Sequence, residues 1–538
     1  MPQIPRPAFI FPLLFLLAVI AGYYIIGTKP SDKKKVTTEK ETSSHPRTTQ
    51  LPENKSLSRT TRRQERTVAD QTTPPFALEN ERIARFKSEA DYQKFLASLK
   101  RRGLNLLGKS DRLMAVRFGF GFGDGFDPND IDDADLSYNY LVSIPAPPSV
   151  QAQAGATGFG RNALSWLGID GDNSAWGKGI TVAVLDSGVN DHIALNGGNG
   201  NITTVTLTEL ADGSEQLGHG TAVASIISGD HVLTPGIAPA SDILSIRITD
   251  SEGASDSFTL AQGILEAADA GSKIINISMG SYGNSSVVLE AVQYAQEKGA
   301  VIVASSGNEG LDNMAYPAAY DGVISVGAVE ANGEHLDFSN SGESLDVVAP
   351  GYQVNAAWGD EQLTSFSGTS ASAPFISGAI AAAMSENPHI TAQQAADLVL
   401  GVTNDAGYPG DDTAYGSGIL AMDRVMENGT PGIYDAAITS QVLVLPNEPT
   451  SLPQVLVTVQ NQGTETLINS PISITSPTGT QTLNISSLAP GQIQTFPVPV
   501  RLPPGDASIS VNSSVQITET DKDPSNNSQS SSFTEEQP

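Results

Sequence analysis

Between residues 180 and 304 the sequence alternates short apolar runs, rich in β-branched residues, with longer runs that place apolar residues at helical spacing. Short apolar runs of this kind are typical of buried strands in parallel sheets. Alternation at this spacing indicates βαβ units, in which helices cover both faces of one parallel sheet. The expected strands are 180–185, 243–248, 273–278 and 300–304, and the expected helices begin at His219 and span 258–270 and 287–298.

The stretch 366–384, FSGTSASAPFISGAIAAAM, opens with small residues around Ser370 and continues as an apolar run suited to a buried helix. Pro374 stands early in this run, where a helix tolerates a residue without an N–H group. The N-terminus of a helix carries partial positive charge and free N–H groups, which favours a nucleophilic serine at that point. Small residues before an apolar helix can also serve close packing alone, so this stretch by itself leaves both interpretations open.

Two other stretches supply the groups that a nucleophilic serine needs. Asp186 ends the expected strand 180–185 in ITVAVLDSGV, and His219 begins a small-residue helix in GHGTAVASIIS. Catalytic groups of open α/β sheets gather at the carboxyl ends of the strands. A serine needs a base to take its proton, and the base needs a carboxylate that fixes its tautomer and stabilises its cation. We therefore expect Asp186, His219 and Ser370 to meet at one edge of the sheet.

The segments VLDSG, GHGTAVAS and SFSGTSASAP resemble the three catalytic signatures of the subtilisin-like serine proteases, or subtilases. The order Asp, His, Ser matches that family, and the resemblance extends over roughly residues 166–427. It implies a serine endopeptidase that hydrolyses peptide bonds through an acyl-enzyme intermediate, with Asp186, His219 and Ser370 as its triad. The elbow motif of the α/β-hydrolases is absent, because Ser372 stands where that motif has its second glycine.

Asn308, in VASSGNEG after the strand 300–304, is by this resemblance the residue of the oxyanion hole. A side-chain amide beside the nucleophile can donate a hydrogen bond to the negative oxygen of the tetrahedral intermediate, with the backbone N–H of Ser370 as second donor. A plain Asn-Glu-Gly turn is the alternative interpretation. The neighbouring Glu309 either favours a basic residue in the substrate or is only an exposed glutamate.

The resemblance also implies where substrate binds. Ser278, Met279 and Gly280 end a strand and resemble the family segment that pairs with an extended peptide and lines the first specificity pocket. Ser251 and Gly253 are expected to supply the opposite rail. Antiparallel addition of a substrate strand gives affinity through the main chain. The expected partners are therefore protein or peptide substrates.

No cofactor is needed for the chemistry that the resemblance implies, and no catalytic metal is expected. Many subtilases have a calcium-ligating Asp where this chain has Ala194, and the loop 229–239 is shorter than the usual calcium-binding version. The usual calcium site of the family therefore looks degraded, while abundant carboxylates keep other hard-cation sites open. The chain has no Cys, which excludes disulfides and thiolate metal sites.

The charge of the chain is divided between two parts. Residues 1–118 contain 22 of the 30 Lys and Arg and 11 of the 59 Asp and Glu, a formal charge of +11, which leaves −40 for residues 119–538. A basic first part and an acidic remainder attract each other. The acidity argues against nucleic acid as a partner, because phosphate contacts need Lys and Arg.

At the N-terminus, residues 9–26 form a nearly continuous apolar run after Arg6. Residues 1–27 therefore read as either a signal peptide or a membrane anchor. Both alternatives predict export to a secreted or extracytoplasmic location, although the Lys33–Lys35 cluster would prefer the cytoplasm. Residues 28–75, rich in Thr, Ser, Lys, Arg and Pro, are expected to form a disordered linker.

Residues 76–150 are expected to form a small α+β unit followed by a connector. A helical pattern spans 89–102, and 104–107 and 113–118 read as strands. Directly before a subtilase domain, such a unit resembles the family's propeptide, which assists folding and inhibits the enzyme until it is cut away. A small structural domain is the alternative.

The connector has two distinct parts. The Gly/Asp-rich run 119–135 is expected to be flexible and acidic, and the Pro-rich run 141–150 to be exposed. Self-cleavage is expected between the latter and Ala163, within a catalytic domain that spans residues 151–430.

Residues 434–530 shift to Val, Thr, Ser, Pro and Gly, with alternating runs separated by turns, at 455–460, 472–475, 493–500 and 507–517. This pattern is typical of a β-sandwich. It resembles the CARDB-like adhesion domains appended to exported bacterial enzymes, so it either binds a surface or protein partner or acts as a spacer. The predicted fold class is thus an α/β catalytic domain with a parallel sheet, preceded by an α+β unit and followed by an all-β sandwich.

Overall fold

The computed structural model describes residues 73–121, 131, 134–148, 155–196, 200–446, 452–503 and 508–534. The predicted signal or anchor, nearly all of the predicted linker and most of the acidic run 119–135 lie outside these residues. Within the described ranges, no helix is both long and apolar enough to cross a membrane. All of the described residues belong to one unit, Thr72–Pro538.

A parallel sheet of seven strands lies at the centre of the chain, in the order β14-β13-β12-β11-β5-β9-β6, and every pairing in it is parallel. Its strands are β5 (Thr181–Asp186), β6 (Ile202–Thr206), β9 (Asp242–Arg247), β11 (Ile274–Ile277), β12 (Val301–Ser305), β13 (Val323–Val329) and β14 (Val347–Pro350). The structure therefore confirms the predicted α/β fold. The four predicted strands agree with β5, β9, β11 and β12 to within one residue at each end.

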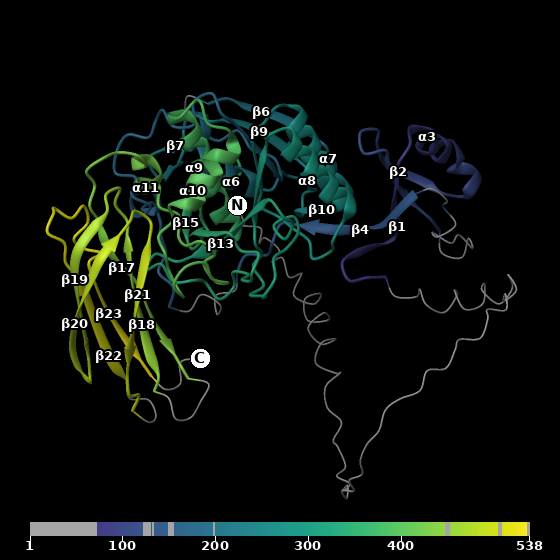
Figure 1. Ribbon diagram of the computed structural model, residues 1–538. Helices are drawn as coiled ribbons and strands as arrows, with labels where there is room; N and C mark the ends of the chain where they lie inside the picture. The colour runs from purple at the N-terminus through teal and green to yellow at the C-terminus, as the bar shows by residue number, and fades with distance from the viewer. Residues whose placement is uncertain are drawn as a thin grey trace, which may run out of the picture. The chain divides into compact units, whose positions relative to one another are not determined.

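Helices cover both faces of this sheet (Figure 1). Those on one face are α6 (His219–Ser228) and α9 (Thr369–Glu386), and those on the other are α7 (Ser257–Asp269) and α8 (Ser286–Glu297). Successive side chains of β5 enter the two cores in turn: Val182 and Val184 pack with α6 and α9, whereas Ala183 and Leu185 pack with α7 and α8. This alternation explains why the four positions 182–185 of β5 are all apolar.

Shorter elements connect and flank the central layer. They are α4 (Ala163–Trp166), α5 (Ile193–Asn196), β7 (Asp230–His231), β8 (Thr234–Pro235), β15 (Val354–Trp358), β16 (Gln362–Phe366), α10 (Ala392–Gly401) and α11 (Met422–Glu427). Thr391 caps α10 by accepting from the backbone N–H of Gln394, whose side chain in turn accepts from the Thr391 N–H. This capping box fixes the start of α10.

The unit before the catalytic domain is an antiparallel sheet with one helix. Its strands are β1 (Ala77–Phe86), β2 (Asn105–Ser110), β3 (Ala115–Gly119) and β4 (Ala134–Ser143), and its helices are α3 (Glu89–Ser98) and the short η1 (Lys100–Arg102). The predicted helix 89–102 is thus shorter, because the chain leaves it after Ser98 and reverses at Gly103, whose φ is +72°. The sequence interpretation missed β1 and β4, and residues 141–143, expected to be exposed, belong to β4.

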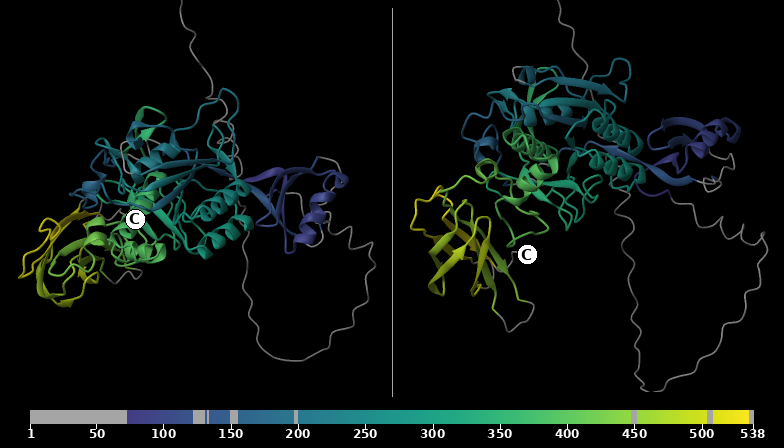
Figure 2. Two further views of the ribbon diagram at one scale, coloured as in Figure 1. Left: turned by 90° about the horizontal axis from the view of Figure 1, so that it is seen from above. Right: turned by 45° about the horizontal axis from the view of Figure 1, so that its top comes forward.

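Two antiparallel sheets form the C-terminal part, drawn from green to yellow in Figure 2. One contains β17 (Ala436–Val444), β18 (Gln454–Asn461) and β21 (Ile493–Pro499); the other contains β19 (Leu467–Ser476), β20 (Gly479–Leu488), β22 (Ile509–Val515) and β23 (Ser528–Phe533). Alternate side chains, among them Val457, Ile474 and Val511, share one core. The predicted all-β sandwich is confirmed, and β17, β20 and β23 are additions to it.

Asp405 lies where the sandwich contacts the preceding helices. Its backbone N–H donates to Gln460 Oε1 at 3.1 Å, and its carboxylate accepts from the N–H of Gly410 at 2.8 Å and from Thr439 Oγ1 at 3.2 Å. Burial raises the pKa of Asp405 to about 6, and the nearby carboxylates of Asp411 and Asp412 add to the rise. The folded protein therefore holds this proton at a pH where the unfolded chain has already lost it.

We expect Asp405→Asn to stabilise the protein at pH 8 and not at pH 4. A folded-state pKa above the unfolded value lowers stability as pH rises from about 4 to about 6, and the cost persists above that range. The amide removes this cost, on the order of 1–3 kcal/mol, and its oxygen can still accept from Gly410. Thermal unfolding of both proteins across this pH range measures the difference, and a difference independent of pH would contradict the prediction.

Candidate active site

Asp186 and His219 form a buried pair at the carboxyl edge of the sheet. Asp186 is the last residue of β5 and His219 the first residue of α6. His219 Nδ1 lies 2.9 Å from Asp186 Oδ1 and 3.0 Å from Oδ2. Because a carboxylate only accepts, Nδ1 carries the proton in this pair, which leaves Nε2 as the acceptor. The ring is therefore oriented as a base.

Neighbouring residues hold this pair in place. The backbone N–H of Ser187 donates to Asp186 Oδ1 at 2.7 Å, and the ring of Phe366 meets the imidazole edge-on at a centroid distance of 5.2 Å. A Cβ at Gly220 would lie 2.4 Å from the carbonyl oxygen of Gly188. Glycine at position 220 is thus what lets α6 approach the end of β5 closely enough for the hydrogen bond. Sequence reasoning did not identify Phe366.

Ser370 is the second residue of α9 and is almost fully buried. Its hydroxyl donates to the carbonyl oxygen of Ser278 at 3.0 Å, and the Ser278 hydroxyl donates to the Ser370 carbonyl oxygen at 3.2 Å. Among the described residues the Ser370 hydroxyl forms this one hydrogen bond, and it forms none with His219. Before it could donate to the imidazole, the Ser370 hydroxyl would have to give up its hydrogen bond to Ser278.

Pro374 explains why the Ser370 carbonyl is available. The prediction placed this proline where a helix tolerates it, but it is the sixth residue of α9, beyond the first turn. A residue with an N–H group at this position would donate to the carbonyl four residues earlier, which is that of Ser370. Because proline cannot donate, the carbonyl accepts from Ser278 instead. The end of β11 and the start of α9 are thereby joined at the serine.

A buried polar chain supports this junction from within the core. Ser377 Oγ donates to Asn276 Oδ1 at 2.9 Å, and Asn276 Nδ2 donates to Ser278 Oγ at 3.0 Å. All three side chains are fully buried. Each polar atom that would be costly to bury alone has a partner. Asn276 and Ser377 were missed from the sequence, where a polar residue inside each of two apolar runs was the available signal.

Asn308 follows β12 and lies beside the start of α9. Its Oδ1 accepts from the backbone N–H and from the hydroxyl of Thr369, both at 2.9 Å. This fixes the amide plane, and Nδ2 has no acceptor among the described residues. A Cβ at Gly368, whose φ is +128°, would lie 2.8 Å from Nδ2. Gly368 thus leaves room for a donor directed past the first turn of α9, as an oxyanion hole requires.

The predicted substrate rails hold a strand of the chain itself. Ser143, the last residue of β4, exchanges two hydrogen bonds with Gly280, at 3.0 and 3.1 Å. On its other side β4 pairs antiparallel with β10 (Ala254–Asp256). The backbone N–H of Ile144 donates to the Gly253 carbonyl oxygen at 3.0 Å. The chain therefore places its own backbone in the position predicted for a substrate.

The remaining predicted binding residues differ in their roles. Met279 is fully buried, in a core cluster that contains residues of α7, α8 and β4. Ser251 lies in a turn, where it forms no hydrogen bond with β4 among the described residues. The contacts on this side of β4 come from β10 and from the carbonyl oxygen of Gly253.

A pocket of about 140 Å³ opens beside this strand. Its walls include Pro145, Gly280, Ser305, Gly307 and Glu309. The carboxylate of Glu309 is exposed and accepts from the backbone N–H of Asn308 at 2.9 Å and from the Tyr282 hydroxyl. Burial and this carboxylate raise the pKa of Tyr282, so the tyrosine stays protonated and remains a donor. Glu309 is thus exposed and already hydrogen-bonded.

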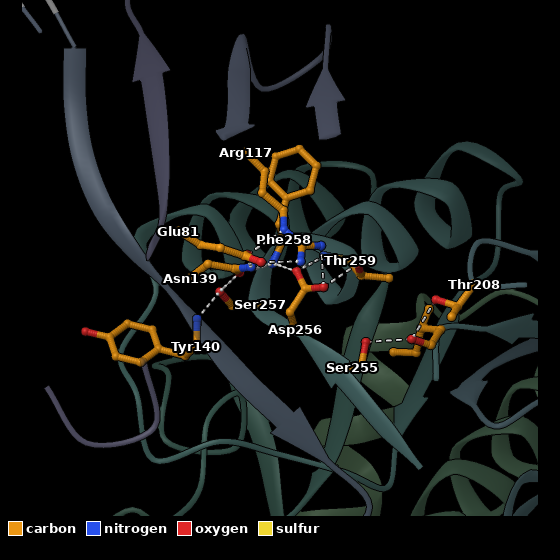
Figure 3. Close-up of polar contacts among 11 residues, drawn as sticks. Glu81, Arg117, Asn139, Tyr140, Thr208, Ser255, Asp256, Ser257, Phe258 and Thr259 are labelled. Carbon is orange, nitrogen blue, oxygen red and sulfur yellow. Dashed lines mark hydrogen bonds and ion pairs between the residues drawn. The ribbon is translucent and has the colours of Figure 1, made fainter. Parts of the chain in front are cut away.

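Upstream of Ser143, polar contacts join β3 and β4 to the start of α7 (Figure 3). Arg117 donates to Asp256, the N-cap residue of α7, at 2.7 Å, and also contacts Glu81 at 2.8 Å. Asn139 Oδ1 accepts from Ser257 Oγ at 3.0 Å. Asn139 and Asp256 therefore satisfy donors at the helix N-terminus together.

Two further ion pairs link basic residues of the first unit to acidic residues of the catalytic domain. Arg85 lies 3.2 Å from Glu290, and Arg112 contacts Asp269. In both pairs the basic residue comes from residues 1–118 and the acidic residue from residues 119–538, in agreement with the charge division in the sequence. For metals, no cluster of three or more His, Cys, Asp or Glu that could hold an ion occurs in the described part of the chain.

Comparison with known proteins places this geometry in a family. The subtilase family (Peptidase_S8) matches residues 177–418. A thermostable alkaline protease from Halalkalibacterium halodurans is 33% identical over 254 residues, covering 47% of this chain and 69% of that protein. Subtilisin Savinase from Lederbergia lenta is 33% identical over 246 residues, covering 45% and 89%.

Among solved structures, fervidolysin from Fervidobacterium pennivorans, a keratinolytic enzyme related to subtilisin, aligns with a TM-score of 0.57. Its sequence identity is 18%, and the alignment covers 83% of this chain and 88% of that one. This likeness concerns the fold alone. It agrees with the parallel sheet and its two helix layers.

The sequence relationships define a serine endopeptidase, of a family whose chemistry needs no cofactor. The chain belongs to the subtilase family, as the three sequence signatures predicted.

Proposed function

We propose that Ser370, His219, Asp186 and Asn308 carry out the reaction. Ser370 Oγ bonds to the peptide carbonyl carbon while His219 Nε2 takes its proton. The C–N bond then breaks as His219 returns the proton to the leaving amine, and water hydrolyses the acyl-enzyme by the same steps. Asp186 holds the imidazole, and Asn308 Nδ2 with the Ser370 N–H stabilises the oxyanion. The buried Asp186–His219 pair, at 2.9 and 3.0 Å, is the observation that carries this proposal.

We further propose that the enzyme is made as a proenzyme, with residues 76–150 as its inhibitor. The support is the position of β4, which pairs with β10 and with Gly280 where a substrate strand is expected. A substrate cannot pair with the same backbone groups while β4 holds them. The ion pairs at Arg85, Arg112 and Arg117 favour this binding through opposite charge.

Export and attachment complete the proposal. The apolar residues 9–26 support export of the proenzyme, with anchoring to the membrane as the alternative to cleavage of a signal peptide. The C-terminal sandwich is proposed to bind a surface or a protein partner, with a spacer role as the alternative. Both statements rest on sequence composition.

Self-processing is tested by mass spectrometry of the purified full chain beside its Ser370→Ala variant. We expect a new N-terminus between residue 141 and Ala163 in the active protein and none in the variant. Adding a catalytic amount of active protein to the variant separates cleavage within one molecule from cleavage between molecules. The same new N-terminus in the variant alone would contradict self-processing.

A further inference from the structure

The strand that occupies the cleft has a defined register. Ser143 and Gly280 donate to each other's carbonyl groups, so they form a hydrogen-bonded pair of an antiparallel ladder. In such a ladder the next hydrogen-bonded pair lies two residues further along each strand. Continued by two residues, the ladder would place residue 145 opposite residue 278. An ordinary residue at position 145 would donate its N–H to the Ser278 carbonyl oxygen.

Position 145 is a proline, and it has no N–H to donate. Pro145 is half-buried and lines the same pocket as Gly280 and Gly307. The Ser278 carbonyl oxygen accepts from the hydroxyl of Ser370 instead, at 3.0 Å. The Ser370 hydroxyl therefore binds the same Ser278 carbonyl oxygen that an N–H at position 145 would bind.

We propose that Pro145 makes this segment a resident, slowly cleaved substrate, whose peptide bond to Ala146 is held beside Ser370 but lacks the hydrogen bond that fixes a good substrate. This inference rests on the proposed catalytic role of Ser370. In the cleavage itself, Ser370 Oγ bonds to the Pro145 carbonyl carbon, the bond to the Ala146 nitrogen breaks, and His219 passes the serine proton to that nitrogen. Water then releases Pro145 as a carboxylate.

Two effects of the proline slow this step. Without the N–H of residue 145, nothing anchors its carbonyl through Ser278, so the reacting carbon is less well positioned. In addition, the Ser370 hydroxyl donates to the Ser278 carbonyl oxygen, whereas attack requires it to donate to His219. An N–H at position 145 would compete for that oxygen and favour rotation of the serine toward the imidazole.

Contacts upstream prevent the strand from sliding to a better register. The backbone N–H of Tyr140 donates to Ser257 Oγ at 3.1 Å, and the Asn139 side chain is held by the same hydroxyl (Figure 3). The Arg117–Asp256 ion pair fixes β3, which lies in the same sheet as β4 with β1 between them, on the same helix. A shift by two residues would break all of these contacts. These contacts therefore keep Pro145 opposite Ser278.

The test compares self-cleavage of the full chain with that of its Pro145→Ala variant. Mass spectrometry over time measures the fragment that begins at Ala146, and the same variants on a Ser370→Ala background show what depends on the serine. We expect Pro145→Ala to form this fragment about tenfold faster, which corresponds to 1.4 kcal/mol in activation free energy. Pro147→Ala, the same change beyond the cleaved bond, cannot place an N–H opposite Ser278 and is expected to match the wild type. Pro145→Ser is a second variant that restores the N–H.

The outcomes separate this inference from the proposed function. If casein is hydrolysed in a Ser370-dependent manner, but Pro145→Ala and Pro145→Ser form the Ala146 fragment no faster than the wild type, Pro145 has no such role. Equal acceleration by Pro147→Ala would also overturn the inference, since the register would then not matter. If no variant hydrolyses casein or itself, the proposed catalytic role fails, and the inference fails with it.

Discussion

Replacing Ser370 by alanine is expected to lower kcat by about 10⁶-fold on a peptide substrate. The alanine cannot form the acyl-enzyme, and the residual rate comes from binding and oxyanion stabilisation alone. This magnitude was established for a subtilisin, a member of the same family. The hydrolysis of a chromogenic peptide, assayed after removal of residues 76–150, gives kcat and KM separately.

The matched control is Ser372→Ala, on the same helix. The Ser372 hydroxyl donates to the Ala349 carbonyl oxygen at 3.1 Å and takes no part in the proposed reaction. Its variant should keep kcat within about tenfold of the wild type, which corresponds to 1.4 kcal/mol. A Ser370→Ala protein that unfolds at the wild-type temperature yet retains more than a thousandth of the activity would refute the assignment of the nucleophile.

Asn308→Ala is expected to lower kcat by about 10²–10³-fold with little change in KM. The structure gives the reason: Thr369 holds Asn308 Oδ1 through two donors at 2.9 Å, so Nδ2 is fixed before a substrate arrives. A donor placed in advance stabilises the oxyanion without reorganisation, and mainly in the transition state. This range, too, comes from a subtilisin.

The Asn308→Asp variant distinguishes the effect of losing the N–H donor from the effect of changing the shape of the side chain. The carboxylate has the same size and can accept from Thr369 in the same way, but it offers no N–H where Nδ2 lies. If the missing donor causes the loss, the aspartate variant loses at least as much activity as the alanine variant. An aspartate variant with wild-type kcat would show that Asn308 acts only through packing.

Much of the central sheet could be predicted because its signal is local. The runs 180–185 and 243–248 are apolar at five and at four of their six positions, as burial on both faces favours. Beyond residue 304 the signal fails: the connections before β13 and β14, 306–322 and 330–346, contain no helix. An interpretation based on alternation therefore stopped before those two strands.

The sequence pointed to candidate site residues but not to the contacts that they make. Three sequence motifs and their order along the chain were enough to select Asp186, His219 and Ser370 as candidates. They could not reveal that the Ser370 hydroxyl donates to the Ser278 carbonyl oxygen, because the two residues lie 92 positions apart in the sequence. For the same reason the pairing of β4 with Gly280 was missed. Local patterns identify strands, whereas the edge at which a strand pairs is set by the fold.

At Pro374, the residue that would be best for the helix differs from the residue that the hydrogen bonds of the site require. A better helix former such as alanine would ordinarily strengthen a helix interior by about 3 kcal/mol. Here its N–H would compete with the Ser278 hydroxyl for the Ser370 carbonyl oxygen, and so loosen the link between strand and nucleophile. Replacing Pro374 to make α9 more regular would therefore raise heat resistance but lower turnover, because the new N–H would bind the Ser370 carbonyl oxygen.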